Sequence, residues 1–123
     1  MSDHSHETGH GKAVLDDLRP HTRALRQAIP EVYAGFAQVH QAAMAAGALD
    51  VKTKELIALA IAVSKQCDGC IASHARGAAQ AGASRQEVAE AIGVTVLMNG
   101  GPATVYGPRA FAAFEEFAPS DAG

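Results

Sequence analysis

The chain has 123 residues and a formal net charge of −3 at pH 7, a length that fits one domain with a modest core. Hydrophobic residues make up 48% of it and aromatic residues only 5%, and its many alanines suit close-packed helices better than strands. No cluster of Lys and Arg supplies the positive surface that nucleic acids require. The longest apolar run, Leu56 to Val63, is far shorter than the roughly 20 residues of a membrane span. We therefore expect an all-α, single-domain protein that binds neither nucleic acid nor membranes.

The N-terminal segment is polar and contains several histidines. It has almost no apolar side chain to bury, so we expect residues 1–12 to form a disordered tail. The segment also lacks the apolar core of a signal peptide, which predicts a cytoplasmic protein. The helical domain is expected to span residues 13–118, and residues 119–123 are expected to fray.

Two helices are predicted in the first part of the domain. One spans Val14 to Ile29 and is interrupted near Pro20, because proline removes a helical hydrogen bond. The other spans Glu31 to Ala46, and Gly47 ends it. Apolar side chains repeat along this second helix at helical spacing, and we call them the Val32 stripe: Val32, Phe36, Val39 and Ala43.

The middle of the chain predicts two helices around a short junction. Asp50 is a suitable N-cap for a helix from Val51 to about Ser64, which is apolar on most sides and therefore lies at the centre of the fold. A further helix begins at Cys67 or Asp68. It ends near Ala81, because a glycine follows.

Two more helices are predicted towards the C-terminus. Ser84 and Glu87 form a capping box that opens a helix through Met98. The Asn99 to Pro102 cluster ends this helix. The last helix is expected to be disturbed at the Gly107-Pro108 pair.

A single copy of the chain is expected to leave apolar surface exposed. Small side chains fill little volume, so its core is thin, and neighbouring copies can bury the surplus by packing helices together. The last helix also carries aromatic side chains at spacings of three, namely Phe111, Phe114 and Phe117, which we assign to the core or to a subunit interface.

Cys67 and Cys70 are the only cysteines of the chain, and His74 follows Cys70 by four residues. Residues four apart share a helix face, so the imidazole can take the proton of the Cys70 thiol or stabilise its thiolate, the reactive form. Cys67 is a second candidate for the attacking thiol, because it lies closer to the helix N-terminus and its favourable dipole. In a reducing compartment such a pair is more often catalytic or metal-binding than a structural disulfide.

Glu55 is a candidate partner of His74, provided that the chain turns between them. On one unbroken helix it would lie about 18 Å from Cys67, out of hydrogen-bonding range. If the chain turns at Lys65-Gln66, the two helices pack side by side and Glu55 approaches the dithiol helix. The alternative is that Glu55 only favours the dipole of its own helix.

Other interpretations of the cysteine pair remain open. Cys67, Cys70 and His74 are suitable zinc ligands, but a tetrahedral site needs a fourth, such as His21 or His40. There is no second C-x-x-C, so we expect no metal; the two other histidines are typical of a surface or an interface. The cysteines could also be two small buried residues. A thioredoxin-like fold is disfavoured because Ala-rich helical sequence surrounds the pair.

The pattern E-x11-C-x2-C-x3-H, formed by Glu55, Cys67, Cys70 and His74, resembles the core motif of the AhpD-like alkylhydroperoxidases in the carboxymuconolactone decarboxylase superfamily. The similarity extends from about Val51 through Met98. The resemblance implies an all-helical protein that assembles as a homotrimer or homohexamer. It also implies a thiol peroxidase that reduces small organic hydroperoxides without a cofactor.

The resemblance assigns a role to each of the four residues. Cys70 attacks the peroxide and becomes a sulfenic acid, and Cys67 resolves that acid into a disulfide. His74 and Glu55 form the proton relay. A dithiol reductant, such as a lipoyl-bearing or thioredoxin-like protein, then restores the thiols.

One departure from the family pattern concerns the two residues between the cysteines. Some peroxidase members have a histidine there, whereas this chain has Asp68-Gly69, and the charge of Asp68 disfavours a nearby thiolate. Peroxidase activity is therefore expected to be weaker than in members with that histidine. The alternatives are a lactone decarboxylase of the same superfamily and a redox-sensing oligomer without turnover.

Overall fold

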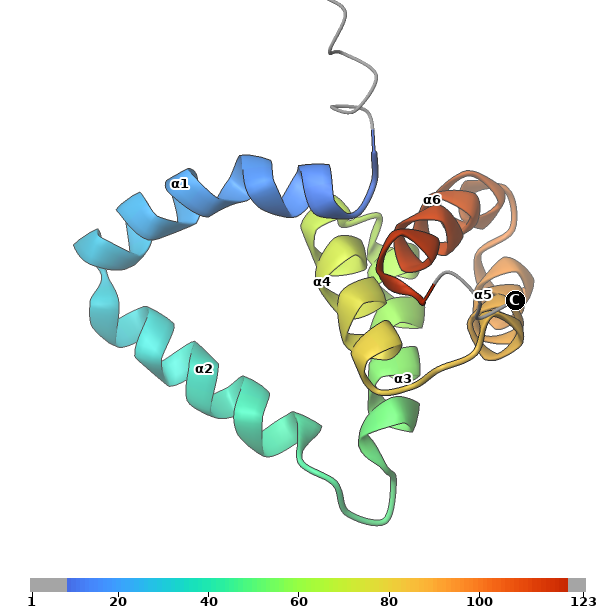
Figure 1. The fold of residues 1–123 in the computed structure, drawn as a ribbon, viewed down its shortest axis with the longest axis horizontal. Coiled ribbons are helices and arrows are strands. Elements are labelled where there is room, and N and C mark those ends of the chain that lie inside the picture. The colour runs from blue at the N-terminus through green and yellow to red at the C-terminus, as the bar shows by residue number, and fades with distance from the viewer. Residues whose placement is uncertain (1–8, 120–123) are drawn as a thin grey trace, which may run out of the picture.

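A computed structural model describes residues 9–119 of the chain (Figure 1), and these residues form six helices and no strand. The prediction of an all-α fold is therefore confirmed. In chain order the helices are α1 (Lys12–Ala28), α2 (Pro30–Met44), α3 (Val51–Lys65), α4 (Asp68–Gln80), α5 (Arg85–Asn99) and α6 (Gly101–Phe117). None of them combines the length and the apolar composition needed to cross a membrane. Most of the expected C-terminal tail and residues 1–8 of the N-terminal one lie outside the described residues.

Helices α3 to α6 pack together as a bundle, and α1 and α2 leave it as a V-shaped arm (Figure 1). The largest fully buried side chains all belong to the bundle: Leu59, Val63, Ile71, Val88 and Phe114. Alanines fill much of the remaining core, which allows the helices to approach closely. The helix at Val51–Lys65 contributes Leu59, Ala62 and Val63 to this core, whereas its apolar Ile57 and Ile61 are exposed.

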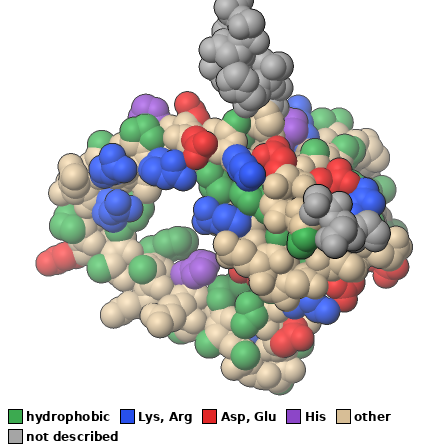
Figure 2. Space-filling model, viewed as in Figure 1, with side chains coloured by type: hydrophobic (Ala, Val, Ile, Leu, Met, Phe, Trp, Pro, Cys, Tyr) green, Lys and Arg blue, Asp and Glu red, His purple; other side chains and the backbone are tan. Residues whose placement is uncertain are grey.

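The arm is largely exposed within one copy of the chain, and its longest half-buried stretch lies in the first turn of α1. Neither α1 nor α2 contains a buried residue, and Val32, Phe36 and Val39 of the Val32 stripe are 63%, 66% and 63% exposed. Figure 2 shows an opening through the molecule between the arm and the bundle. The Val32 stripe therefore does not face the core of its own bundle, and an apolar face of this size on a folded chain indicates an interaction surface.

Both prolines expected to disturb a helix lie inside continuous ones. Pro20 lies in α1 and Pro108 in α6, so the predicted interruptions are wrong. Each proline is exposed, and water can bind the carbonyl that loses its helical partner. Gly107 lies where α6 packs against α5. A Cβ at this position would be 2.8 Å from Cγ2 of Ile92 on α5, so a residue without a side chain lets the two helices approach closely.

The start of α1 is held by the end of α6. The Glu116 carboxylate accepts hydrogen bonds from the backbone N–H groups of Gly11 (3.3 Å) and Lys12 (2.9 Å), which satisfies helix-terminal donors that no N-cap side chain reaches. The expectation of a disordered tail over residues 1–12 is therefore wrong for its last residues. Sequence spacing gave no indication of this tertiary cap, because Glu116 is remote in the chain.

Candidate active site

The junction between α3 and α4 reverses the chain. Gln66 adopts the left-handed conformation (φ 56°, ψ 45°) that commonly ends a helix. The N–H of Cys67 then donates to the carbonyl of Ala62 at 3.2 Å, which closes the turn. Because the chain turns here, α4 runs back beside α3 (Figure 1), and the alternative of one straight helix is wrong.

The two cysteines lie at the first turn of α4. Cys67 is its N-cap, and its Sγ accepts a hydrogen bond from the backbone N–H of Cys70 at 3.3 Å. Their Cα atoms are 5.2 Å apart and the sulfurs form a disulfide, a separation that suits this bond without a change of the backbone. Cys70 is exposed, whereas Cys67 is half-buried. An external molecule therefore reaches residue 70 more easily.

Glu55 and His74 form a hydrogen bond between α3 and α4. Nδ1 of His74 lies 2.8 Å from Oε1 of Glu55, and because an ionised carboxylate only accepts, the ring N–H is assigned to Nδ1. The His74 side chain is only 21% exposed and that of Glu55 only 12%, so water weakens their hydrogen bond little. The other ring nitrogen, Nε2, has no hydrogen-bond partner among the described side chains. It is the atom that can accept a proton from a thiol.

Gly77 creates the space that Glu55 occupies, and sequence analysis missed it. A Cβ at this position would overlap the carboxylate carbon and both carboxylate oxygens of Glu55. The Glu55 carboxylate thus lies directly against the backbone of α4, next to His74. Its position three residues after His74, on the same helix face, was the signal that could have identified it.

His40 is the second residue that sequence analysis left out of the site. Its ring lies against that of His74, with centroids 6.2 Å apart and planes inclined by 20°. It comes from α2, and no spacing rule connects it with α4. No three His, Cys, Asp or Glu side chains within residues 9–119 are arranged as ligands of a metal ion.

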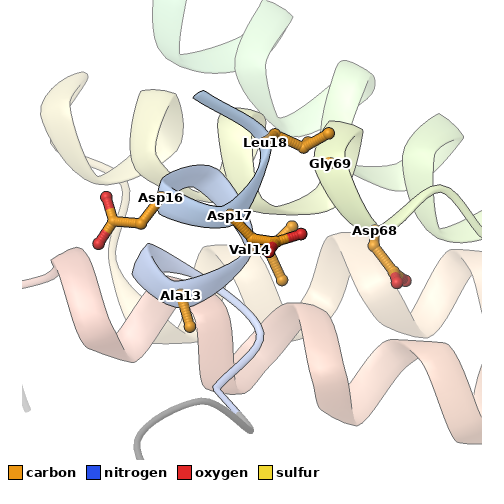
Figure 3. A pocket seen from close by; sticks show the side chains of 7 residues that line it. All are labelled: Ala13, Val14, Asp16, Asp17, Leu18, Asp68 and Gly69. Atoms are coloured by element: carbon orange, nitrogen blue, oxygen red, sulfur yellow. The ribbon is translucent and has the colours of Figure 1, made fainter. Parts of the chain in front are cut away.

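A groove of about 830 Å³ lies between α1 and the start of α4 (Figure 3). It lies between the first turns of α1 and the residues between the cysteines, Asp68 and Gly69. Because Gly69 has no side chain, Leu18 can lie close to α4: a Cβ at Gly69 would be 2.9 Å from Cδ1 of Leu18. Asp17 and Asp68 make the groove acidic, which disfavours the approach of anions from this side.

Comparison with known proteins assigns the chain to a family. Residues 30–116, from the start of α2 to the last turn of α6, match the carboxymuconolactone decarboxylase family. The chain belongs to this family. The resemblance inferred from the four-residue motif is thereby confirmed at the level of the superfamily.

Members of the carboxymuconolactone decarboxylase family are also found among solved structures. The crystal structure of apo-lpg0406 from Legionella pneumophila, described as a protein of this family, is 45% identical and superimposes with a TM-score of 0.81, over 85% of this chain and 93% of that one. An uncharacterized protein of Cupriavidus necator is 38% identical over 104 residues, which are 85% of this chain and 92% of the relative. An uncharacterized protein in the cox locus of Paracoccus denitrificans is 40% identical over 81 residues, 66% of this chain and 73% of the relative.

Proposed function

We propose that this carboxymuconolactone decarboxylase family protein is a dithiol peroxidase that reduces small organic hydroperoxides. The observation that carries the proposal is the hydrogen bond between Glu55 and His74, formed on the helix that also presents the exposed Cys70. A carboxylate that holds one imidazole nitrogen leaves the other free to act as a base. His74 follows the exposed Cys70 by four residues on α4, a spacing that puts both on one helix face. A base within reach of a thiol activates the sulfur as a nucleophile.

The first step oxidises Cys70. His74 takes the thiol proton, and the thiolate attacks the terminal oxygen of the hydroperoxide. A sulfur–oxygen bond forms and the O–O bond breaks, so Cys70 becomes a sulfenic acid and the peroxide is reduced to an alkoxide. The protonated His74 returns its proton to the alkoxide, and the alcohol leaves.

The second step forms the disulfide. The Cys67 sulfur attacks the sulfenic sulfur of Cys70, the S–S bond forms, and the hydroxyl group leaves as water with the proton of Cys67. In the disulfide-bonded structure the Cα atoms are 5.2 Å apart, within the usual range for this bond. The adjacent thiol also protects Cys70, because the sulfenic acid is consumed before further peroxide can oxidise it.

Reduction of the disulfide requires an external dithiol, which we propose is carried by a lipoyl-bearing or thioredoxin-like protein of the cytoplasm. Its thiolate attacks the exposed sulfur of Cys70, and Cys67 leaves as a thiolate. The backbone N–H of Cys70 that donates to Cys67 Sγ stabilises this leaving group at the helix N-terminus. The second thiol of the donor then resolves the mixed disulfide, so the donor is oxidised and both cysteines are reduced.

We further propose that copies of the chain associate as a trimer or hexamer through the arm. The exposed Val32 stripe provides an apolar surface that a second copy can cover, and Figure 2 shows an opening between the arm and the bundle. Lactone decarboxylation is the second candidate function, because the family bears that name. By the family resemblance the dithiol is not a hallmark of the lactone decarboxylases, so its presence favours the peroxidase, and a direct assay of carboxymuconolactone separates the two.

Turnover with a reductant tests the proposal. The reduced wild type should consume cumene or t-butyl hydroperoxide through many cycles when a dithiol donor is supplied. Cys70→Ser should abolish turnover, whereas Cys67→Ser should stop after one oxidation as the sulfenic acid of Cys70. A wild type that reacts once but is reduced by no dithiol would instead be a redox-sensing oligomer.

A further inference from the structure

His40 places a second imidazole against the catalytic one. It projects from α2, and its ring lies against that of His74 with 6.2 Å between centroids and 20° between planes, within the range of offset-stacked aromatic pairs. We propose that His40 is a positioning residue, which covers one face of His74 and directs its Nε2 atom towards Cys70. This inference rests on the proposed function, because it assigns His40 a part in the same proton transfer.

Glu55 alone does not fix the orientation of the His74 ring. Its carboxylate holds a single atom, Nδ1, at 2.8 Å, and one hydrogen bond leaves the ring able to tilt about that contact. A flat group against the ring face limits this tilt. The edge contact from α3 and the face contact from α2 together restrict the direction in which Nε2 can accept a proton.

The contact with Glu55 also suits the charge that His74 acquires. When His74 takes the proton of Cys70 it becomes an imidazolium, and the carboxylate oxygen of Glu55 lies 2.8 Å from its Nδ1. The carboxylate of Glu55 stabilises the same charge from the ring edge. The two contacts therefore have separate parts: Glu55 faces the ring edge that carries the charge, and His40 limits the tilt of the ring.

A separate contact fixes the end of α2 beside the site. Nζ of Lys54 donates to the carbonyls of Ala43 at 2.9 Å and Ala45 at 2.5 Å, at the C-terminus of the helix that carries His40. Lys54 precedes Glu55 directly on α3. The residue before the relay carboxylate thus ties down the helix that supplies His40, although α2 has no buried residue of its own.

The experiment measures the reactivity of Cys70 in a Cys67→Ser background, with iodoacetamide and with cumene hydroperoxide as separate reagents. His40→Ala and His40→Gln, which remove the ring, should slow both reactions by about 3- to 10-fold, and His40→Phe, which keeps a flat ring, should stay within about twofold of the parent. Gln41→Ala is the matched control, because Gln41 is an exposed neighbour about 100° around α2.

The results distinguish the positioning role of His40 from the proposed peroxidase function. If His40→Ala and His40→Gln both alkylate as fast as the parent, or if His40→Phe is as slow as they are, the positioning role is wrong. If the parent alkylates rapidly but does not react with peroxide, the proposed function fails, and the iodoacetamide rates still decide the role of His40. Circular dichroism of each variant identifies any loss of helix, and His40→Gln keeps a helix-favouring side chain should His40→Ala not fold.

Discussion

Oε1 of Glu55 lies 2.8 Å from Nδ1 of His74, although 19 residues separate them in the chain. The turn at Gln66 brings them together by laying α4 alongside α3. The pair converts an ordinary histidine into one with a fixed tautomer and one available nitrogen. It also places a negative charge where His74 becomes positive during the proposed reaction.

The substitution Glu55→Gln tests the charge in this pair. The introduced amide can still accept a hydrogen bond from His74 but no longer stabilises the imidazolium, so oxidation of the thiols by cumene hydroperoxide should slow by on the order of 10-fold. The rate of thiol loss in the reduced protein measures this. Glu31→Gln, an exposed carboxylate at the start of α2, should leave the rate unchanged; an equal loss in both variants would show that the effect is not specific to the pair.

Two glycines test the space reserved for Glu55. A methyl group at Gly77 overlaps the Glu55 carboxylate, whereas one at Gly93 meets nothing within 4 Å. Gly77→Ala should therefore displace Glu55, lower the free energy of unfolding by about 1–3 kcal/mol and slow peroxide reduction as Glu55→Gln does. Gly93→Ala should raise the free energy of unfolding by about 0.5–1 kcal/mol, since both positions are helical. Urea denaturation compares them, and a stabilised, fully active Gly77→Ala would contradict the assigned contact.

The exposed Val32 stripe predicts the response of the assembly to a charge. Phe36, 66% exposed in one copy, should become buried between copies, so Phe36→Asp should shift the protein from an oligomer to a monomer. Sedimentation velocity measures the change. Gln41→Asp adds the same charge on the same helix outside the stripe and should leave the oligomer intact. A wild type that sediments as a monomer at micromolar concentration would refute the proposed interface.

The ion pair between Lys52 on α3 and Glu87 on α5 predicts how the free energy of unfolding depends on pH. Hydrogen bonds from the Ser84 backbone and from Lys52 lower the pKa of Glu87 below its ordinary 4.5, and the bond to Glu87 raises the pKa of Lys52 above its ordinary 10.5. The stabilisation by Glu87 is therefore complete above pH 4.5 and is lost as the pH falls through the lowered value. That of Lys52 is complete below pH 10.5 and is lost as the pH rises through the raised value.

Glu87→Gln should accordingly flatten the stability profile at both ends. On going from about pH 7 to about pH 3, the variant should lose less of its free energy of unfolding than the wild type does, as measured by urea denaturation at each pH. Asp17→Asn is the control, because Asp17 is an exposed carboxylate on a different helix, α1. Parallel profiles for the wild type and Glu87→Gln would show that the pair does not contribute.

The local features of the fold could be predicted from neighbouring residues. The Asp50 cap and the Ser84–Glu87 capping box are present as expected, because each depends on residues three apart. A turn at Lys65-Gln66 was one of two alternatives left open by the sequence, and the structure has it at Gln66. Helix capping depends only on residues that are close in the sequence, so both caps could be predicted without the tertiary structure.

The features that sequence analysis missed depend on distant packing. The residues of the Val32 stripe are spaced as in a helix that packs on a core, yet α2 leaves the bundle and they are exposed. Periodicity predicts which face of a helix is apolar, but it does not identify the surface against which that face packs. Gly77 and His40 became part of the site only once α2, α3 and α4 had been placed relative to one another. Proline was expected to break α1, but an exposed position tolerates the lost hydrogen bond.

The central claim is that Cys70 is an activated sulfur nucleophile whose sulfenic acid is captured by Cys67. Its most direct test is the rate and stoichiometry of thiol loss when the fully reduced protein meets an equimolar amount of cumene hydroperoxide. The account predicts that two thiols disappear per chain as the Cys67–Cys70 disulfide forms, much faster than free cysteine reacts under the same conditions. Thiols that survive, or that are lost no faster than those of free cysteine, would contradict it.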